Sequence, residues 1–234
     1  MLSPALVKVI NLLPEPILIK LSKFLVRKML KKYANIKVEG FEKIEKIEGP
    51  KIFICNHLSN ADGLILNEIL KEKYDPTFVA GIKLSKDPLT RLGTIAVKTV
   101  NIKPNSADKE AITKIVKLVR SGENLMIFPE GTRSRVGSMI EGKKGILLIA
   151  RLTKATIIPI AMTGTEILLP INKDGDMAGE NFNHADINIK FGEPVVMPVK
   201  DKEEDKHDYD NRCLEHIMKS IANLLPEKYK GIYK

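Results

Sequence analysis

His57 and Asp62 are the two side chains in this sequence best placed to do acid–base chemistry together. They lie in the segment KIFICNHLSNADGLIL, where an apolar run at 51–55 is typical of a buried strand and residues 61–70 have the spacing of an amphipathic helix. A carboxylate held across such a strand-to-helix turn accepts the proton on one imidazole nitrogen and leaves the other nitrogen as a base. The alternative is structural: Asp62 caps the helix, and His57 bonds to backbone.

A second polar segment, FPEGTRSR at residues 128–135, follows another apolar run. The guanidinium of Arg133 matches a phosphate monoester bidentately, and Arg135 adds a second cation. Glu130 is expected to orient Arg133 or to bond a hydroxyl group of the same ligand. The competing interpretation is a surface turn with an ordinary Glu to Arg ion pair, which contributes little.

Taken together and in this order, NHLSNAD and FPEGTRSR resemble the glycerolipid acyltransferase family, whose best-known members acylate 1-acylglycerol 3-phosphate. The resemblance covers roughly residues 35–200, including the apolar stretch 157–160 with its central proline and the GKKG segment at 142–145. It implies a catalytic pair and a set of phosphate-binding residues. The catalytic pair is His57 and Asp62, and the phosphate-binding set is Lys103, Glu130, Gly131, Thr132, Arg133 and Arg135.

Lys103 departs from the family pattern, which has an arginine after a strand at the matching position. Lysine offers phosphate a point charge but lacks the bidentate fork. The head group of the acceptor is therefore less well defined than the chemistry. Glycerol 3-phosphate, or a lysolipid with another head group, remains an alternative acceptor.

The reaction implied by the resemblance transfers a fatty acyl group from a thioester, either acyl-CoA or acyl carrier protein, to the free hydroxyl of a lysophospholipid. With 1-acylglycerol 3-phosphate the product is phosphatidic acid, in phospholipid biosynthesis. His57 removes the hydroxyl proton, Asp62 fixes the imidazole, and backbone amides around residues 60–63 stabilise the oxyanion. No metal and no cofactor beyond the thioester co-substrate is expected. The non-enzymatic alternative is a basic peripheral module that binds anionic lipid.

Composition favours a globular, basic chain with anionic partners: 234 residues, a net charge of +9 and a pI near 9.4. The absence of Trp and an aromatic content of 5% argue against nucleic acid and in favour of an anionic phospholipid surface. Cys55 and Cys213 imply no disulfide framework and a reducing, cytoplasmic setting. Although Cys55 lies two residues before His57, a packed core thiol is favoured over a Cys-His nucleophile.

Residues 1–33 are expected to form an N-terminal amphipathic two-helix element at the membrane surface, with helices at 2–13 and 17–32 separated by two prolines. We expect it to lie peripherally on the cytoplasmic face, since no uncharged run is long enough to span a bilayer. A helix pair packed on the core is the alternative. The predicted membrane-binding residues are the apolar stripe Leu18, Leu21, Leu25 and Met29 and the basic stripe Lys20, Lys23, Arg27 and Lys31.

Residues 34–234 are expected to form one α/β domain, with a mixed central sheet flanked by helices, because short apolar runs alternate with helical patterns. Residues 172–186 are predicted to be an exposed loop and residues 200–210 a solvated, charged connection. The predicted strands lie at 36–39, 51–55, 77–81, 95–100, 124–128, 156–161 and 187–191, and further helices at 61–70, 107–121, 143–152 and 213–225.

Overall fold

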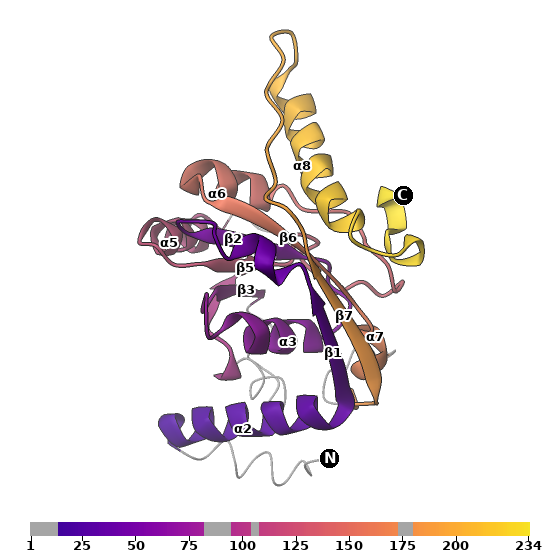
Figure 1. Ribbon diagram of the computed structural model, residues 1–234. Helices are drawn as coiled ribbons and strands as arrows, with labels where there is room; N and C mark the ends of the chain where they lie inside the picture. The colour runs from indigo at the N-terminus through magenta and orange to yellow at the C-terminus, as the bar shows by residue number, and fades with distance from the viewer. Residues whose placement is uncertain (1–13, 82–94, 104–107, 173–179) are drawn as a thin grey trace.

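A computed structural model describes residues 14–81, 95–103, 108–172 and 180–234, and within them a seven-stranded sheet forms the centre of the protein (Figure 1). The strand order is β1-β7-β6-β2-β5-β3-β4. All neighbouring strands are parallel except β6 and β7, so the predicted mixed sheet is confirmed. The strands are β1 (Ala34–Glu39), β2 (Lys51–Cys55), β3 (Thr77–Gly81), β4 (Thr99–Ile102), β5 (Leu125–Ile127), β6 (Thr156–Thr163) and β7 (Ala185–Phe191).

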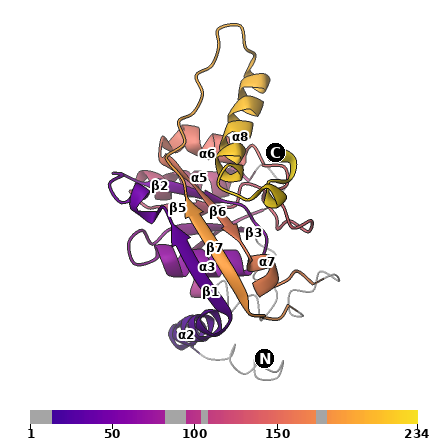
Figure 2. The ribbon, with the colours of Figure 1, turned by 45° about the vertical axis from the view of Figure 1, so that its right-hand side comes forward.

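Helices cover both faces of the sheet, as Figure 2 shows from the side. One face carries α5 (Lys109–Arg120), α6 (Gly145–Thr153) and α8 (Lys206–Ala222). The other carries α2 (Glu15–Tyr33), α3 (Ala61–Leu70) and α7 (Thr165–Leu168). Short 3₁₀ turns are η1 (Phe41–Ile44), η4 (Glu227–Tyr229) and η5 (Gly231–Tyr233).

Strand β2 lies in the middle of the sheet and is buried along its whole length. Its side chains alternate between the two cores: Ile52 and Ile54 join the cluster under α5, α6 and α8, while Phe53 and Cys55 join the cluster under α3. Helices on both faces explain why residues 52–55 of the strand form a continuous apolar run rather than an alternating one. The residues that follow Cys55 therefore emerge at the centre of the sheet edge.

The three segments expected to carry chemistry all follow parallel strands. His57 follows β2, residues 128–135 follow β5, and Lys103 follows β4. Strands β2 and β5 are hydrogen-bonded neighbours, with Ile54 opposite Ile127. The carboxyl ends of parallel strands meet at one edge of a sheet, which is where open α/β folds bind their ligands.

Several predicted elements keep their bounds, and others shift. Strands β2 and β3 and helix α3 lie where predicted, whereas β4 begins at Thr99 rather than at residue 95, because residues 95 and 96 are helical. Strand β7 begins at Ala185, inside the predicted loop 172–186. The short helix α7 was not predicted.

Helix α8 begins inside the charged run 200–210, so the prediction of a solvated connection there is wrong from residue 206 onward. Asp205 explains the early start, because its Oδ1 accepts hydrogen bonds from the backbone N–H groups of His207 (2.6 Å) and Asp208 (3.0 Å). This is an N-cap, which satisfies amides that the helix itself leaves open.

Helix α2 packs on the body of the protein. Its start is favoured by Pro16 in the first turn, and Leu18 and Leu30 are buried. Arg27 donates to Glu68 of α3 at 2.6 Å. Leu18 is therefore a core residue rather than a lipid contact, and Arg27 is engaged within the protein. The other predicted apolar positions, Leu21, Leu25 and Met29, are half-buried, and the predicted helix at 2–13 lies outside the described residues.

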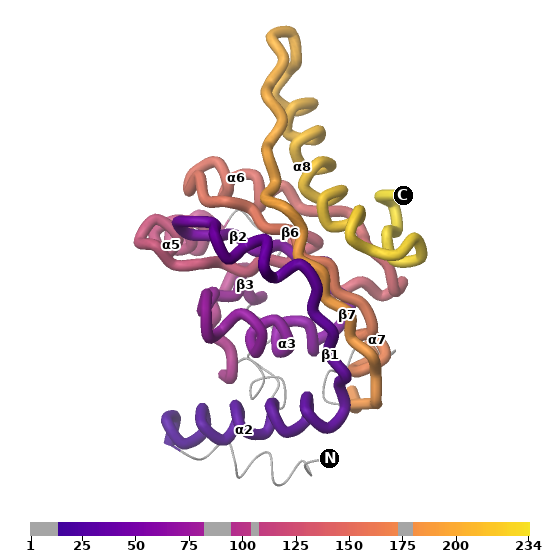
Figure 3. The backbone as a smooth tube through the Cα atoms, in the orientation of Figure 1, coloured from indigo at the N-terminus to yellow at the C-terminus, as the bar shows by residue number. Residues whose placement is uncertain are grey.

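Figure 3 traces how the chain leaves α2 directly into β1, which runs beside β7 at the end of the sheet. The described part of the N-terminal element is therefore joined to the domain without a linker, because Tyr33 ends the helix and Ala34 begins the strand. Tyr33 also contacts the ring of Phe182, with 6.1 Å between the ring centroids.

Candidate active site

The turn between β2 and α3 brings His57 and Asp62 together. Nδ1 of His57 lies 2.8 Å from Oδ2 of Asp62. The same oxygen accepts from the backbone N–H groups of Leu58 (2.7 Å) and Ser59 (2.9 Å). Asp62 is only 1% exposed. Its carboxylate therefore both shapes the turn and holds the imidazole, and it binds amides that precede α3 rather than capping the first turn of that helix.

The imidazole of His57 is fixed in two ways. Because a carboxylate oxygen only accepts hydrogen bonds, Nδ1 carries the proton in the neutral imidazole and Nε2 has the lone pair. The ring also stacks on Phe128, with 4.1 Å between centroids and 16° between planes. The side chain is 19% exposed. A fixed imidazole with a basic Nε2 and partial access to solvent is suited to general base catalysis.

Glu130 has a different place from the one predicted. It is completely buried, and its two oxygens accept from the backbone N–H groups of His57 (2.8 Å) and Ile140 (2.9 Å). Arg133 pairs with another acid. Glu130 thus holds the backbone at His57 rather than orienting Arg133, and a fully buried carboxylate is poorly placed to bond a glycerol hydroxyl. The pKa of Glu130 is raised to about 7, because the raising effect of burial outweighs the lowering effect of the two backbone hydrogen bonds.

A tight turn brings Glu130 back toward β2. Gly131 N–H donates to the carbonyl of Phe128 at 3.0 Å, with Pro129 inside the turn and Gly131 at a φ of 71°. Beyond the turn, Ser134 N–H donates to the carbonyl of His57 at 2.7 Å. Both backbone groups of His57 are therefore bonded to the segment 130–134, and the two sequence motifs form one unit.

Arg133 is half-buried and forms an ion pair with Glu180, 2.5 Å from Nη1 to Oε1. The second oxygen of Glu180 accepts from Nδ2 of Asn60 at 2.7 Å. Glu180 is 8% exposed, although it lies in the predicted exposed loop 172–186. The structure thus corrects that prediction at residue 180 and joins the turn at Asn60 to the loop at Arg133 through one carboxylate.

The remaining predicted phosphate-binding residues lie on the surface. Gly131, Thr132 and Arg135 are exposed in the loop after β5. Lys103 is exposed at the end of β4, and its backbone N–H donates to Asp108 Oδ2 at 3.0 Å. Their role in binding phosphate stays a prediction.

Two polar residues that sequence reasoning did not single out anchor the turn between β2 and α3. Nδ2 of Asn56 donates to the carbonyl of Met162 at 2.8 Å, and Met162 N–H donates back to Oδ1 of Asn56 at 2.9 Å. Ser59 Oγ donates to the carbonyl of Leu169 at 2.7 Å. Both side chains are buried. The available signal was the run of small polar residues directly after a fully apolar strand, since such residues need internal partners when buried.

Cys55 is a core thiol. It is fully buried, and burial raises the pKa of its thiol well above the ordinary value, with the nearby Asp62 and Glu130 carboxylates adding to the shift. A thiolate nucleophile is therefore disfavoured at this position. Both Cys55 and Cys213 are free and buried.

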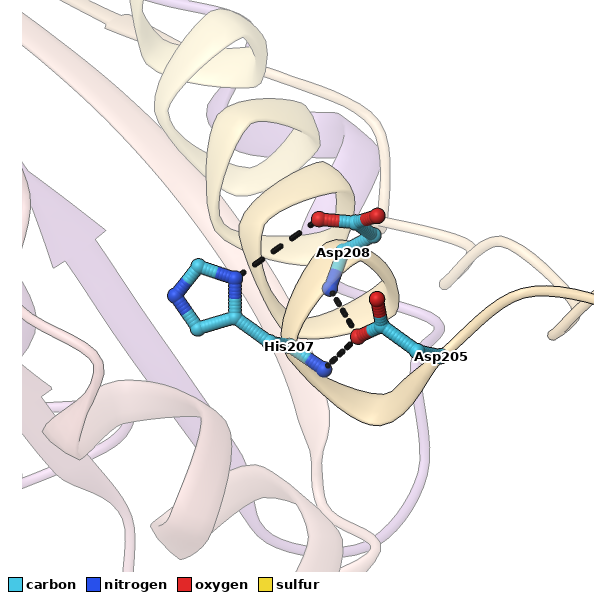
Figure 4. Close-up of side chains that lie close together, drawn as sticks. All are labelled: Asp205, His207 and Asp208. Carbon is cyan, nitrogen blue, oxygen red and sulfur yellow. Dashed lines mark hydrogen bonds and ion pairs between the residues drawn. The ribbon is translucent and has the colours of Figure 1, made fainter.

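In the part of the chain that the structure describes, one trio of side chains lies close enough to hold a metal ion: Asp205, His207 and Asp208 (Figure 4). All three are exposed at the start of α8, and Asp205 is already engaged in capping the helix. Helix capping accounts for this arrangement.

None of the helices within the described ranges is long and apolar enough to cross a membrane.

Comparison with known proteins shows that the sequence containing this site matches a family. Residues 35–163, more than half of the 234 residues, match the profile of the family described as Acyltransferase. The matched range contains the turn at 57–62 and the loop at 128–135 and ends at the last residue of β6.

Curated relatives carry a shared description. A chloroplastic 1-acyl-sn-glycerol-3-phosphate acyltransferase of Arabidopsis thaliana, LPAT1, is 26% identical over 165 residues, which cover 70% of this chain and 44% of the relative. A 1-acyl-sn-glycerol-3-phosphate acyltransferase of Cocos nucifera is 29% identical over 186 residues, covering 77% of this chain and 56% of the relative. The chain thus spans about half the length of these relatives.

A solved structure supports the fold. The crystal structure of the 1-acyl-sn-glycerophosphate (LPA) acyltransferase PlsC from Thermotoga maritima superposes with a TM-score of 0.61. It is 24% identical in sequence, and the match covers 88% of this chain and 79% of the other.

Proposed function

Because the chain belongs to the acyltransferase family, we propose that it is an O-acyltransferase which moves a fatty acyl group from a thioester to the free hydroxyl of 1-acylglycerol 3-phosphate. The product would be phosphatidic acid. The observation that carries the proposal is the bond from His57 Nδ1 to Asp62, in a turn whose backbone is held by Glu130. The descriptions of the relatives support the acceptor.

The proposed reaction uses Nε2 of His57 as the general base. Nε2 takes the proton of the acceptor hydroxyl while the hydroxyl oxygen attacks the thioester carbonyl carbon. The tetrahedral intermediate then collapses, the carbon–sulfur bond breaks, and the imidazolium returns its proton to the departing thiolate. Asp62 keeps Nδ1 protonated and stabilises the imidazolium. The nucleophile belongs to the substrate, so the protein needs no serine or cysteine of its own.

The oxyanion of that intermediate needs hydrogen-bond donors, and we assign this role to backbone amides at the start of α3. Within that stretch, Ala61 N–H bonds Ser59 Oγ at 3.1 Å and Asp62 N–H bonds the carbonyl of Ser59 at 3.3 Å. The amides of Asn60 and Gly63 are thus the better candidates of the predicted range 60–63.

Arg133 is the proposed anchor for the acceptor phosphate, because a guanidinium presents paired donors to phosphate oxygens. Lys103 and Arg135 are exposed at the same edge of the sheet and would add charge. Lysine at position 103 supports a second candidate acceptor, glycerol 3-phosphate or a lysolipid with another head group. The ammonium group of lysine is a point charge, and it discriminates between head groups less strictly than the bidentate guanidinium of an arginine.

A lipid acceptor requires contact with a membrane. We propose that the protein binds peripherally to the cytoplasmic face of the membrane and that α2 makes the contact. At about 100° per residue, Phe24 points away from the buried side of the helix. Phe24 is 62% exposed and Ile17 is 52% exposed. Exposed lysines surround them: Lys20, Lys28 and Lys31. Apolar side chains among cations are suited to an anionic lipid surface.

Product analysis by mass spectrometry tests the proposal. Purified protein is incubated with a panel of lysolipids and glycerol 3-phosphate, each with an acyl-CoA and an acyl carrier protein donor. The proposal predicts an acylated product with 1-acylglycerol 3-phosphate, with at least one donor. Salt-dependent binding to anionic vesicles without turnover on any acceptor would instead favour a non-enzymatic lipid-binding module.

A further inference from the structure

We propose that Glu180 is a positioning residue. It holds the guanidinium of Arg133 at a fixed position relative to the turn at residues 57–62, and so sets the affinity for a phosphate-bearing acceptor. Glu180 lies outside both sequence motifs and beyond residues 35–163. The inference rests on the function proposed above, and it adds a specificity-determining residue to that site.

The carboxylate of Glu180 bridges the two motifs. Oε1 pairs with Nη1 of Arg133 in the loop after β5, and Oε2 accepts from Nδ2 of Asn60, two residues before Asp62. Each oxygen of Glu180 thus has its own partner. The guanidinium is tied through one carboxylate to the turn that carries the His57–Asp62 pair.

Burial makes this tie rigid. The side chain of Glu180 is 3% exposed and that of Arg133 is 16% exposed. A charge-assisted hydrogen bond shielded from water is both strong and directional. The pair with Glu180 uses one nitrogen of a group that has five N–H donors, so Arg133 retains the capacity to bind phosphate as well.

The same burial argues against competition between Glu180 and the acceptor for Arg133. If a phosphate displaced Glu180, the carboxylate would remain in the interior with only the neutral amide of Asn60 for a partner. An uncompensated buried charge is unfavourable. The arrangement is therefore most stable when Arg133 binds the carboxylate and the phosphate at the same time.

Steady-state kinetics of Glu180→Gln tests the assignment. We expect the KM for 1-acylglycerol 3-phosphate to rise about tenfold, because the neutral amide of Gln lacks the charge that strengthens the bond to Arg133 and so fixes the guanidinium less firmly. The KM for the donor and kcat should change little. In an Arg133→Ala background the same substitution should add no further change, because Glu180 acts through Arg133.

Two further variants separate positioning from folding. Glu193→Gln makes the same change at an exposed acid whose pair with Lys43 spans 3.2 Å, and it should leave both KM values unchanged. Glu180→Asp keeps the charge and should restore part of the acceptor affinity. Thermal unfolding of each variant shows whether it folds, and the Asp variant carries the test if the Gln variant does not.

Four results would overturn the assignment. A lower acceptor KM in Glu180→Gln would mean that the carboxylate competes with phosphate. An equal loss in the wild-type and Arg133→Ala backgrounds would mean a purely structural role. Unchanged kinetics beside normal wild-type turnover would reject this inference alone, whereas absence of wild-type turnover on every phosphate-bearing acceptor would reject the proposed function and this inference with it.

Discussion

At the scale of single residues, Asp62 binds both the imidazole of His57 and the backbone of the turn, whereas the side chain of His57 is proposed to act only in the reaction. The carboxylate of Asp62 satisfies the amides of Leu58 and Ser59 as well as the imidazole, whereas the partly exposed side chain of His57 bonds Asp62 and stacks on Phe128. Substitution of the two residues should therefore affect activity alike and stability differently.

Asp62→Ala should lower the free energy of unfolding by roughly 2 to 4 kcal/mol, because two buried amides lose their acceptor. His57→Ala should stay within about 1 kcal/mol of wild type, since a partly exposed side chain outside the core is removed. Urea unfolding of the three proteins measures this. Equal stability of the two variants would mean that Asp62 does not shape the turn.

Glu130 should give the protein a distinct dependence of stability on pH. Its pKa is raised from 4.5 in the unfolded chain to about 7 in the folded protein. The protonated form is thus favoured by folding, so its contribution is full below about pH 4.5 and is lost as the pH rises through 7. Between pH 5 and pH 8 the loss should be about 2 to 3 kcal/mol.

Glu130→Gln provides the control, because its neutral amide cannot titrate. Urea unfolding of both proteins at several pH values gives the difference in stability, in which the other titrating groups cancel. The advantage of wild type over the variant should shrink as the pH rises from 5 to 8. A constant difference would show that Glu130 stays ionised throughout.

The sequence was sufficient to predict that His57 and Asp62 lie together, and insufficient to predict the residues that support them. His57 and Asp62 are close in the chain, so a turn had to bring them together. Glu180 lies 120 residues from Asn60, and Met162 lies 106 residues from Asn56, so those contacts depend on the tertiary fold. No local pattern distinguishes a buried glutamate that binds backbone from one that binds a ligand.

At the scale of elements, prediction succeeded where burial alone fixes the pattern. Strand β2 and helix α3 are both lined by apolar side chains and were found within their true bounds. The start of α8 was missed because charged residues fill its first turns, and α7 was missed because four residues are too few for a periodic pattern. In both cases capping or tertiary contact, rather than apolar spacing, decides the structure.

The C-terminal turns η4 and η5, which lie outside the matched family region, support the loop that follows β5. Gly142 N–H donates to the hydroxyl of Tyr233 at 2.9 Å, and Met139 N–H donates to the carbonyl of Tyr229 at 2.8 Å. Between these two lies Ile140, whose N–H holds Glu130. The turns η4 and η5 thus hold the loop at residues 139–142, which binds Glu130, and Glu130 in turn binds the backbone of His57.

Tyr233→Phe should cost about 1 to 3 kcal/mol of stability, because the amide of Gly142 loses its acceptor, and should lower turnover through the displaced loop. Tyr209→Phe is the matched control, because it removes a hydroxyl in the first turns of α8 that bonds the carbonyl of Pro198 at 3.0 Å. Urea unfolding and turnover are measured for both. If Tyr209→Phe lowers turnover as much as Tyr233→Phe does, the bond between Tyr233 and Gly142 is not the cause of the lower turnover.

At the scale of the whole molecule, a basic protein presents a helix with an exposed aromatic side chain. Double reversal Lys20→Glu and Lys28→Glu should reduce sedimentation with anionic vesicles, since each cation near such a surface contributes roughly 1 kcal/mol. Phe24→Ser should reduce it through lost burial in the lipid boundary. Activity on a soluble short-chain acceptor should persist in both variants.

The double reversal Lys43→Glu and Lys73→Glu, at two exposed lysines outside α2, serves as the control for net charge. Vesicle binding that falls equally in this control would indicate a general charge effect. Binding that is unchanged in all of the α2 variants would leave α2 as a packing element only.

The most direct test of the central claim compares wild type with His57→Ala on 1-acylglycerol 3-phosphate, with both thioester donors and detection of phosphatidic acid by mass spectrometry. Wild type is expected to form the product. The variant should retain its fold and lose about 10²- to 10⁴-fold in rate, the usual contribution of a general base. Turnover by His57→Ala within a few-fold of wild type would contradict the assignment of His57 as the base.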